Sequence, residues 1–338
     1  MTIGWGIVGI GTHADHEMAP ALNQSANARL VAVCSRDIQR ARGFAAKHGV
    51  VQAYDSLDKM LQDPELDVVY IATPNNLHVQ QAVEVAEAGK HILCEKPMAL
   101  TVADCDSMLQ ACNKNKVKLG VCYQHRYHPA HVEARRYIQS GDIGNISVAK
   151  VQLCHPSATV PLKGWRSDPS MAGAGALMGQ GIHCVDLLRY LLDSEVTEVR
   201  AMTDEEPPRH PVDEMVYCIL KFENGAHGMV TAGILAPASD NDAVLYGSKA
   251  KLTCKRTLGR QIEKLGELLV DGDSLNVRMT FPTEEPSLYN NSRVIAAVNK
   301  WIEDDTEPYI SGENGLKMVG ITNAIIESSR RGMAVKIA

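Results

Sequence analysis

The sequence has 338 residues, of which 45% are apolar and 22% charged, and its formal net charge is −6. A globular chain of this length is expected to fold as two domains. The mild charge, with no Lys/Arg-rich run, argues against a nucleic-acid partner. No stretch of about eighteen apolar residues predicts a membrane span.

The start of the chain and its cysteines bear on its compartment. The stretch MTIGWGIVGIGTHAD lacks the basic and apolar regions of a signal peptide. The nine cysteines include no C-x-x-C pair, and an odd number without framework spacing favours reduced thiols. We therefore expect a cytoplasmic protein in which most thiols are small buried apolar groups.

The first third of the chain alternates strand-like and helical stretches. Apolar runs predict strands at 3–8, 30–34, 68–72, 91–94 and 119–123, with helices at 15–23, 38–47, 57–61, 79–87 and 102–115. Runs such as DVVYIATP are apolar throughout, which is typical of strands buried on both faces of a parallel sheet. Repeated β-α-β units with short connections predict a doubly wound, Rossmann-type α/β domain over 1–122.

After residue 123 the pattern changes to an α+β type. Helices are predicted at 130–138, 175–192, 287–303 and 312–330, and strand-like runs include AVLYGS, AKLTCKR and SLNVRMTF. The run MVYCILKFENGAHGMVTAGI predicts a hairpin at Asn224-Gly225. The stretch 203–214 is predicted to be a loop between strands. We expect residues 123–338 to form a substrate-binding and oligomerisation domain with a large, open, mainly antiparallel sheet.

A glycine-rich turn follows the first predicted strand. The run GIGTHA at 9–14 fits G-x-G-x-x-G/A between a strand and a helix, where this motif binds a dinucleotide. Gly9 permits the tight turn, and Gly11 lets the backbone approach a pyrophosphate at the helix N-terminus, beside Thr12 and His13. The alternative is a glycine-rich turn without a ligand, but the β-α-β context favours the dinucleotide.

The tip of the second strand bears on the choice of cofactor. An acidic residue there would bind the ribose 2′-hydroxyl of NAD. This chain has Ser35 and Arg36 instead, with Arg40 one helical turn on, and a hydroxyl with two guanidinium groups suits a 2′-phosphate. Asp37 can be explained as the N-cap of the next helix. The sequence therefore favours NADP, with NAD as the alternative.

The strand predicted at 68–72 ends in polar residues. In open α/β sheets, ligands bind outside the carboxyl ends of the strands. The residues concerned are Thr73, Pro74, Asn75 and His78. We expect them to contribute to the cofactor site, although Thr73 or Asn76 could cap the following helix, and both roles can coexist.

The run LCEKPMAL, residues 93–100, places Lys96 at the end of a buried strand, between Glu95 and Pro97. A solvated lysine needs no such position, whereas a lysine that faces a ligand does. An apolar sheet edge and a positively charged nicotinamide would lower the pKa of Lys96, so that it could exchange a proton near neutral pH. The alternative is a structural lysine–carboxylate pair.

Three motifs together resemble the Gfo/Idh/MocA family of NAD(P)-dependent oxidoreductases, which act mainly on sugars and cyclitols. They are ATPNNLH, CEKP and GWRSDPSMAGAGALMGQGIHCVD, and the resemblance extends over nearly the whole chain. The run HPSATVPLKGWRSDP, with Ser35 and Arg40, is most similar to the 1,5-anhydrofructose reductase branch, which uses NADPH. The resemblance implies that Lys96 contacts the reacting hydroxyl beside the nicotinamide, that the bond before Pro97 is cis, and that Glu95 belongs to the cofactor site.

The second catalytic motif departs from the family's pattern, G-G-G-x-L-x-D-x-G-x-H-x-x-D. His183 is present, but Gly179 replaces the carboxylate one helical turn earlier. By resemblance, Lys96 and His183 remain as the catalytic residues. They could suffice alone with water or substrate filling the gap, or the site could be catalytically weak. A further alternative is that the missing group comes from Tyr123, His155 or Asp186.

Other residues are assigned to the substrate cleft by resemblance. Trp165 and Arg166 correspond to an element near cofactor and substrate, although Trp165 could simply anchor an exposed loop. Arg126 would line the sugar pocket, together with Tyr123 and His155. The histidines at 125, 128 and 131 have a metal-like spacing, but a proline interrupts them and no carboxylate or cysteine completes the set. No metal site is therefore expected.

The sequence thus predicts hydride transfer between nicotinamide and a carbinol or carbonyl carbon of a sugar, cyclitol or related polyhydroxy compound. The cofactor carries the chemistry and the protein supplies the geometry. The resemblance also implies a homodimer or homotetramer in which open sheets pack face to face. Two alternatives are an NAD-dependent glycoside hydrolase on the same framework and a non-catalytic nucleotide or sugar sensor, which Gly179 favours and Lys96 and His183 oppose.

Overall fold

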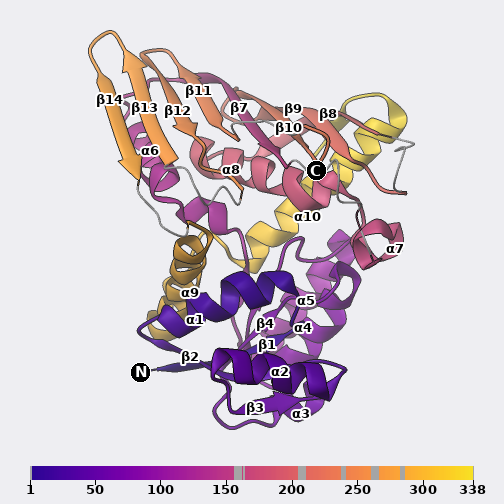
Figure 1. Ribbon diagram of the computed structural model, residues 1–338. Coiled ribbons are helices and arrows are strands. Elements are labelled where there is room, and N and C mark those ends of the chain that lie inside the picture. Colours follow the sequence, from indigo (N-terminus) through magenta and orange to yellow (C-terminus); the bar gives the residue numbers. More distant parts are fainter. Residues whose placement is uncertain are drawn as a thin grey trace. The chain divides into compact units, whose positions relative to one another are not determined.

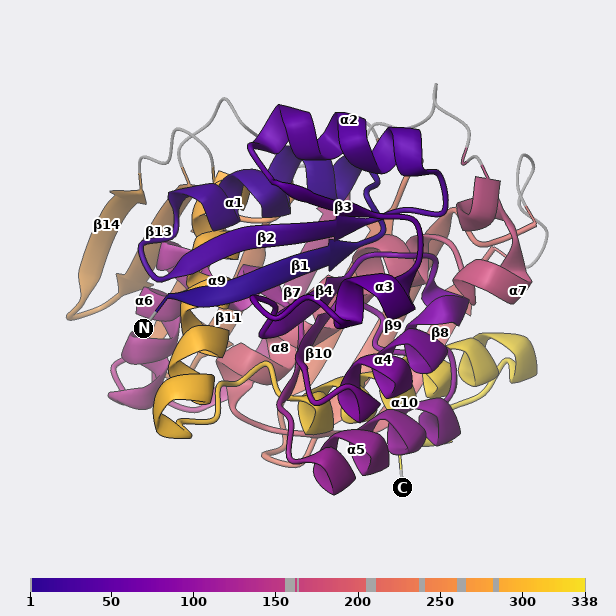
Figure 2. The ribbon, with the colours of Figure 1, turned by 90° about the horizontal axis from the view of Figure 1, so that it is seen from below.

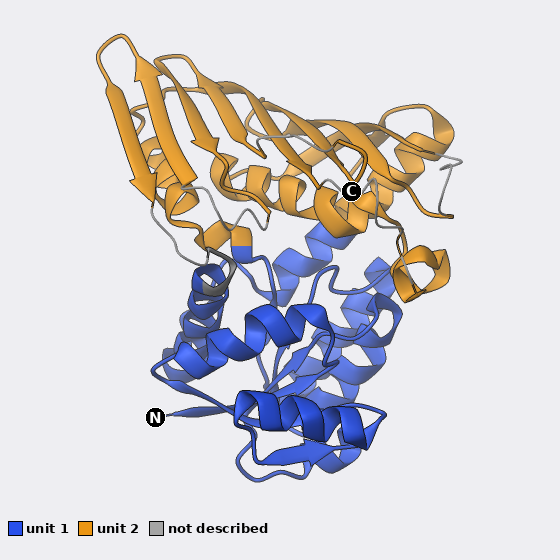
Figure 3. Ribbon diagram, viewed as in Figure 1, with its two compact units in different colours: residues 1–124, 287–319 blue, residues 125–286, 320–338 orange. Residues whose placement is uncertain are grey.

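The computed structural model describes residues 2–155, 162, 164–204, 211–236, 241–259, 266–281 and 286–337. The chain forms two compact units (Figure 3). Unit 1 comprises residues 1–124 and 287–319, and unit 2 comprises residues 125–286 and 320–338. Both units are therefore discontinuous in sequence, and the division of cofactor and substrate binding between domains meeting at residue 123 stays a prediction.

Unit 1 is built on a six-stranded parallel sheet with the order β3-β2-β1-β4-β5-β6. Its strands are β1 (Ile3–Val8), β2 (Ala28–Cys34), β3 (Gln52–Tyr54), β4 (Val68–Ile71), β5 (His91–Cys94) and β6 (Leu119–Val121). Every residue of β1 and β4 is buried, as in strands covered on both faces. The strand order reverses between β1 and β4, where such sheets bind ligands.

Helices cover both faces of this sheet, with α1 and α2 on one side and α4 and α5 on the other (Figure 2). The helices are α1 (Ala19–Gln24), α2 (Ile38–His48), α3 (Leu57–Leu61), α4 (His78–Glu87), α5 (Val102–Asn115) and α9 (Pro286–Asp304). Of α9, the residues from 287 on belong to unit 1. Helix α9 belongs to unit 1 because it packs on the sheet: Trp5 Nε1 donates to Asn299 Oδ1 at 3.0 Å.

Unit 2 is built on a nine-stranded sheet with the order β14-β13-β12-β11-β7-β10-β9-β8-β15. Its strands are β7 (Ile146–Cys154), β8 (Val196–Thr203), β9 (Met215–Phe222), β10 (His227–Gly233), β11 (Ala243–Gly247), β12 (Ala250–Lys255), β13 (Gly266–Gly272), β14 (Asn276–Phe281) and β15 (Val335–Lys336). All neighbours are antiparallel except β7 and β10, which run parallel.

One face of this sheet is covered by helices (Figure 1). The helices of unit 2 are α6 (Pro129–Gln139), α7 (Pro169–Ala172), α8 (Ile182–Leu192) and, in its residues from 320 on, α10 (Gly312–Arg331). Gly228 lets α8 approach β10 closely, because a Cβ there would lie 2.9 Å from Leu188. Along β9, side chains alternate between buried and exposed from Val216 to Phe222, so the second face of the sheet stays open.

The predicted fold class is confirmed: a parallel doubly wound sheet and a mainly antiparallel second sheet. The hairpin at Asn224-Gly225 is also confirmed, since β9 and β10 pair across it and Gly225 has a φ of 87°. Residues 205–210 of the stretch 203–214 lie outside the described residues. In the described part of the chain no helix could span a membrane, and all nine cysteines are buried with no disulfide.

Candidate active site

The turn after β1, residues 9–14, forms a cradle in front of a helix N-terminus. Gly9 has a φ of 93°, and a Cβ on it would lie 2.5 Å from the Ala72 carbonyl carbon. At Gly11 the opposite holds, because a Cβ would meet no atom within 4 Å. A helical stretch begins at Thr12, directly beyond this open space, and continues through a π-helical turn, Ala14–Met18, into α1. The first glycine is therefore required by the fold itself, and the second leaves room for a pyrophosphate at a helix N-terminus.

At the end of β2, Asp37 is occupied by the backbone. Its Oδ1 accepts hydrogen bonds from the amides of Gln39 at 2.9 Å and Arg40 at 3.3 Å, as predicted for an N-cap. Arg36 and Arg40 are exposed, and neither forms an ion pair with any residue that the structure describes. Both arginines follow the end of β2, where a ribose 2′-substituent would bind.

The loop after β4 is held by a buried histidine. The His78 side chain is fully buried, with Nδ1 2.9 Å from the Pro97 carbonyl oxygen and Nε2 3.1 Å from that of Thr73. Burial lowers its pKa, although the two carbonyls oppose this. His78 therefore joins the ends of β4 and β5, while Pro74 and Asn75 open the short 3-10 turn before α4. Thr73 Oγ1 donates to Gln81 Oε1 at 2.6 Å.

The end of β5 carries Glu95 and Lys96, and the Lys96–Pro97 peptide bond is cis, as the resemblance implies. Glu95 is anchored at both carboxylate oxygens: Tyr70 donates to Oε1 at 2.5 Å, and the Lys96 amide donates to Oε2 at 3.2 Å. Burial raises the pKa of Glu95, but His13, Lys96 and Tyr70 outweigh it and lower it to about 2. The carboxylate is therefore ionised and fixed beside a half-buried lysine.

Unit 2 carries His183 on α8, directly after a π-helical turn, Leu177–Gly181. The His183 ring is buried and meets the His125 ring edge-on, with centroids 4.7 Å apart. A Cβ on Gly179 would meet no atom within 4 Å, so the missing carboxylate leaves open space. Such π-helical turns occur often at functional sites.

Two predicted residues of unit 2 are bound to each other. Arg126 donates to both oxygens of Asp186, at 2.5 and 3.1 Å to Oδ1 and 2.9 Å to Oδ2, and both side chains are at most 4% exposed. A buried bidentate pair of this kind cannot easily lose one partner. We therefore expect Asp186 and Arg126 to hold α8 rather than to replace the missing carboxylate or contact a substrate.

The remaining predicted residues are spread over both units. Tyr123, in unit 1, is fully buried. In unit 2, the His155 amide donates to the Gly233 carbonyl at 2.9 Å, and the Arg166 guanidinium stacks on the Trp165 ring with its carbon 4.5 Å from the centroid. Most of the run that precedes Trp165, residues 156–161 and 163, lies outside the described residues.

The three histidines with metal-like spacing have structural partners. His128 caps α6 by accepting from the Ala130 amide at 3.2 Å. His131 has Nδ1 2.6 Å from the His125 carbonyl oxygen and Nε2 2.7 Å from Thr257 Oγ1, and burial lowers its pKa to about 4. Among the described residues, no group of three potential ligands is arranged to hold a metal ion.

Sequence reasoning missed several supporting residues. Asp213 accepts from the amides of Gly175 at 2.6 Å and Leu177 at 2.7 Å, and so holds the start of the segment that carries His183. Tyr70 lies in the middle of an apolar strand, where nothing marks it as a partner of Glu95. For Asp213 the available signal was a carboxylate at the end of a loop.

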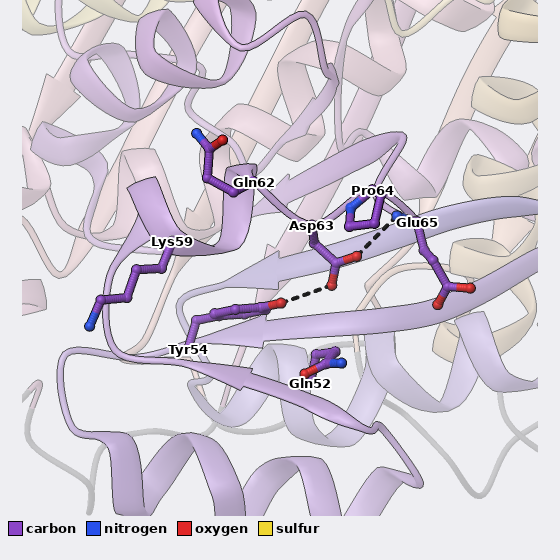
Figure 4. Close-up of a pocket in the computed structure, with 7 residues that line it drawn as sticks. All are labelled: Gln52, Tyr54, Lys59, Gln62, Asp63, Pro64 and Glu65. Atoms are coloured by element: carbon purple, nitrogen blue, oxygen red, sulfur yellow. Dashed lines mark hydrogen bonds between the residues drawn. The ribbon is translucent and has the colours of Figure 1, made fainter.

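A polar pocket of about 420 Å³ lies elsewhere in unit 1, along β3 and the loop before β4 (Figure 4). In it, the Tyr54 hydroxyl donates to Asp63 Oδ2 at 3.0 Å. The lining residues are Gln52, Tyr54, Lys59, Gln62, Asp63, Pro64 and Glu65. None of them is a predicted site residue, and this pocket is not the candidate site.

The strand order of unit 1, its glycine-rich turn and the polar residues at the ends of β4 and β5 define a dinucleotide-binding Rossmann unit. Comparison with known families agrees. The model of the Gfo/Idh/MocA oxidoreductase family with an NAD-binding Rossmann fold matches residues 3–123, and that of the family's C-terminal domain matches residues 131–253. The chain belongs to this family and is an NAD(P)-dependent oxidoreductase.

Individual relatives show the range of the family. The chain is 26% identical over 338 residues to 1,5-anhydro-D-fructose reductase of Ensifer adhaerens, covering 98% of both chains. It is 31% identical over 286 residues to trans-1,2-dihydrobenzene-1,2-diol dehydrogenase of Mus musculus, covering 83% of this chain and 80% of the other. The structure of levoglucosan dehydrogenase with NADH matches with a TM-score of 0.86 and 25% identity over all of both chains.

Proposed function

We propose that the chain is an NADP-dependent dehydrogenase or reductase acting on a CH–OH group of a sugar, cyclitol or related polyhydroxy compound. The observation that carries this proposal is the placement of Lys96 beside an anchored, ionised Glu95 at the carboxyl end of β5, the strand next to β4 at the switch point. Relatives named for sugar substrates support the substrate class.

The residues present fit a dinucleotide, because Gly11 has no Cβ and leaves open space where the backbone must approach a pyrophosphate closely. Gly9, Gly11, Thr12 and the loop at 73–75 would hold the cofactor, which supplies the hydride acceptor or donor. Lys96 would take the hydroxyl proton when the substrate is oxidised and return it when a carbonyl is reduced. His183 would orient the reacting hydroxyl or relay its proton.

The choice of cofactor is tested by replacing Arg36 with alanine. Losing one charge-assisted contact to a 2′-phosphate is expected to raise the Kd for NADPH about tenfold and leave that for NADH unchanged. Both constants come from fluorescence titration. Arg42→Ala, another exposed arginine near this edge, is the matched control and should bind like the wild type. NADH binding that equals or exceeds NADPH binding in the wild type would contradict the NADP assignment.

The same purified protein then serves for a substrate screen. Oxidation of sugars and polyols is followed by the appearance of reduced nicotinamide, and reduction of keto sugars by its loss. Cleavage of a glycoside without any change in nicotinamide absorbance would favour the glycoside hydrolase, and cofactor binding with no turnover would favour the sensor.

We also propose that the open face of the unit 2 sheet packs against a second copy of this chain. Exposed apolar side chains line up across β8 to β11, with Ile219 opposite Met229 and Tyr217 opposite Met202. Charges of both signs lie on the same sheet, including Lys150 on β7 and Glu198 on β8, so the face can complement itself about a two-fold axis.

Ile219→Glu should therefore convert the oligomer to a monomer, because it buries a charge without a partner at the centre of the face. Light scattering coupled to size-exclusion chromatography measures the mass. Val51→Glu, at a residue 88% exposed in unit 1, is the control and should keep the wild-type mass. A wild-type protein that is already monomeric would refute the interface.

A further inference from the structure

His13 lies in a cluster of ionisable groups that connects the glycine-rich turn to the end of β5. Its Nδ1 is 3.3 Å from Glu17 Oε2, one helical turn on, and its Nε2 is 3.3 Å from Glu95 Oε1. The His13 side chain is 23% exposed, whereas those of Glu17 and Glu95 are 6% and 14% exposed. The imidazole thus lies between two carboxylates that are more buried than the ring itself.

The groups around His13 favour its charged form. Burial lowers the pKa of His13, but Glu95 and Glu17 outweigh it and raise the pKa from 6.5 to about 9. On the other elements packed here, Tyr70 donates to Glu95 and Asn291 Nδ2 lies 3.5 Å from Glu17 Oε2. Lys96 is the second cation, and burial holds the pKa of the Cys122 thiol well above its ordinary range.

The second link runs from Glu95 to Lys96. The Lys96 amide donates to the Glu95 side chain, and the charge of the lysine acts on the same carboxylate. A group that fixes the Glu95 carboxylate and balances its charge therefore affects Lys96 in two ways. It affects the hydrogen bond from the Lys96 backbone amide, and it affects the environment of the Lys96 charge. His13 is the residue of the glycine-rich turn whose side chain lies within ion-pair distance of Glu95.

Resting on the proposed function, we propose that His13 is a positioning residue: its charged ring fixes Glu95, and so Lys96, to the cradle that receives the cofactor's pyrophosphate. Cofactor binding and the placement of the lysine are thereby coupled. Without the imidazolium, Glu95 would present an unbalanced buried charge beside an incoming phosphate and beside Lys96. Both ring nitrogens face carboxylates, so the ring acts on a diphosphate ester through its positive charge rather than through a hydrogen bond.

The sign of the pH dependence follows from the raised pKa. His13 stays protonated up to about pH 9, so its attraction for a diphosphate is fully present at neutral pH and is lost as the pH rises through that value. We expect the wild-type Kd for NADPH to rise about tenfold between pH 7.5 and 10. The variant His13→Gln keeps a hydrogen-bond donor without the charge. Its Kd for NADPH should already be raised at pH 7.5, and should then change less than about twofold between pH 7.5 and 10.

A second readout reports on Lys96 without any substrate or cofactor. In His13→Gln the unbalanced Glu95 favours the protonated lysine, so acetylation of Lys96 by acetic anhydride at pH 8, followed by peptide mass spectrometry, should slow about threefold or more. The control is His16→Gln, which removes a histidine that is 63% exposed on the same helix and should behave like the wild type in both readouts.

The proposal would be overturned if His13→Gln showed either the wild-type pH dependence of the Kd for NADPH or the wild-type rate of Lys96 acetylation. A histidine that only packs would leave both quantities unchanged. If the wild type bound neither NADPH nor NADH, the proposed function would fail instead. The acetylation comparison would then still decide whether His13 acts on Lys96 through Glu95.

Discussion

Replacing Lys96 by methionine is expected to lower kcat by about a thousandfold, while the Kd for the nicotinamide cofactor changes less than about threefold. Methionine keeps the length and the apolar stem of lysine but cannot exchange a proton. Lys96 is only half-buried at the end of β5, and Glu95 is anchored by Tyr70 and by the backbone amide of Lys96, which the substitution keeps, so the fold should persist. Steady-state kinetics with a substrate from the screen, and fluorescence titration of the cofactor, measure the two quantities.

Two further variants sharpen this prediction. Lys96→Arg retains a positive charge that cannot be given up near neutral pH, so it should support oxidation no better than methionine. Lys114→Met removes an exposed lysine of α5 and should keep the wild-type kcat. If Lys96→Met lost cofactor binding in parallel with kcat, Lys96 would be a binding residue and the proposed acid–base role would be wrong.

The architecture of unit 1 could be predicted because its strands are apolar on both faces. Strands β1 and β5 and helix α5 begin and end at the predicted residues. Strand β3 was missed, since QAY is a short edge strand with exposed and half-buried residues and carries no apolar period. The parallel pairing of β7 with β10 was not predictable either, because register over such sequence distances depends on packing rather than on local pattern.

The site was predictable where a motif fixes the backbone and unpredictable where partners come from distant elements. Gly9, Gly11 and Lys96 lie at strand ends that a β-α-β pattern locates. The contacts of Glu95 with Tyr70 and His13, and of Arg126 with Asp186, join residues 25 to 82 positions apart, and no periodicity encodes them. His78 illustrates the difference: its position was foreseen, but its full burial between two carbonyls was not.

Replacing each of the two glycines of the cradle by alanine should impair a different property: the stability of the protein at Gly9, and the binding of the cofactor at Gly11. At Gly9 the φ of 93° is strained for alanine, and the new Cβ would lie 2.5 to 2.7 Å from backbone atoms of Ala72 and Thr73. The cofactor-free protein is therefore expected to lose at least about 2 kcal/mol of stability, or about 5 °C or more in the midpoint of thermal unfolding. Calorimetry of the cofactor-free protein measures this.

At Gly11 the Cβ enters space that the fold leaves empty, so Gly11→Ala should unfold like the wild type without cofactor. The same methyl group would occupy the space where the backbone must approach a pyrophosphate, and the Kd for NADPH should rise about tenfold or more. Gly43→Ala, on the exposed face of α2 with no atom within 4 Å of its Cβ, is the control for a helical glycine and should impair neither property. A Gly11→Ala protein that binds NADPH as tightly as the wild type would place the pyrophosphate elsewhere and remove the structural basis for the cofactor site.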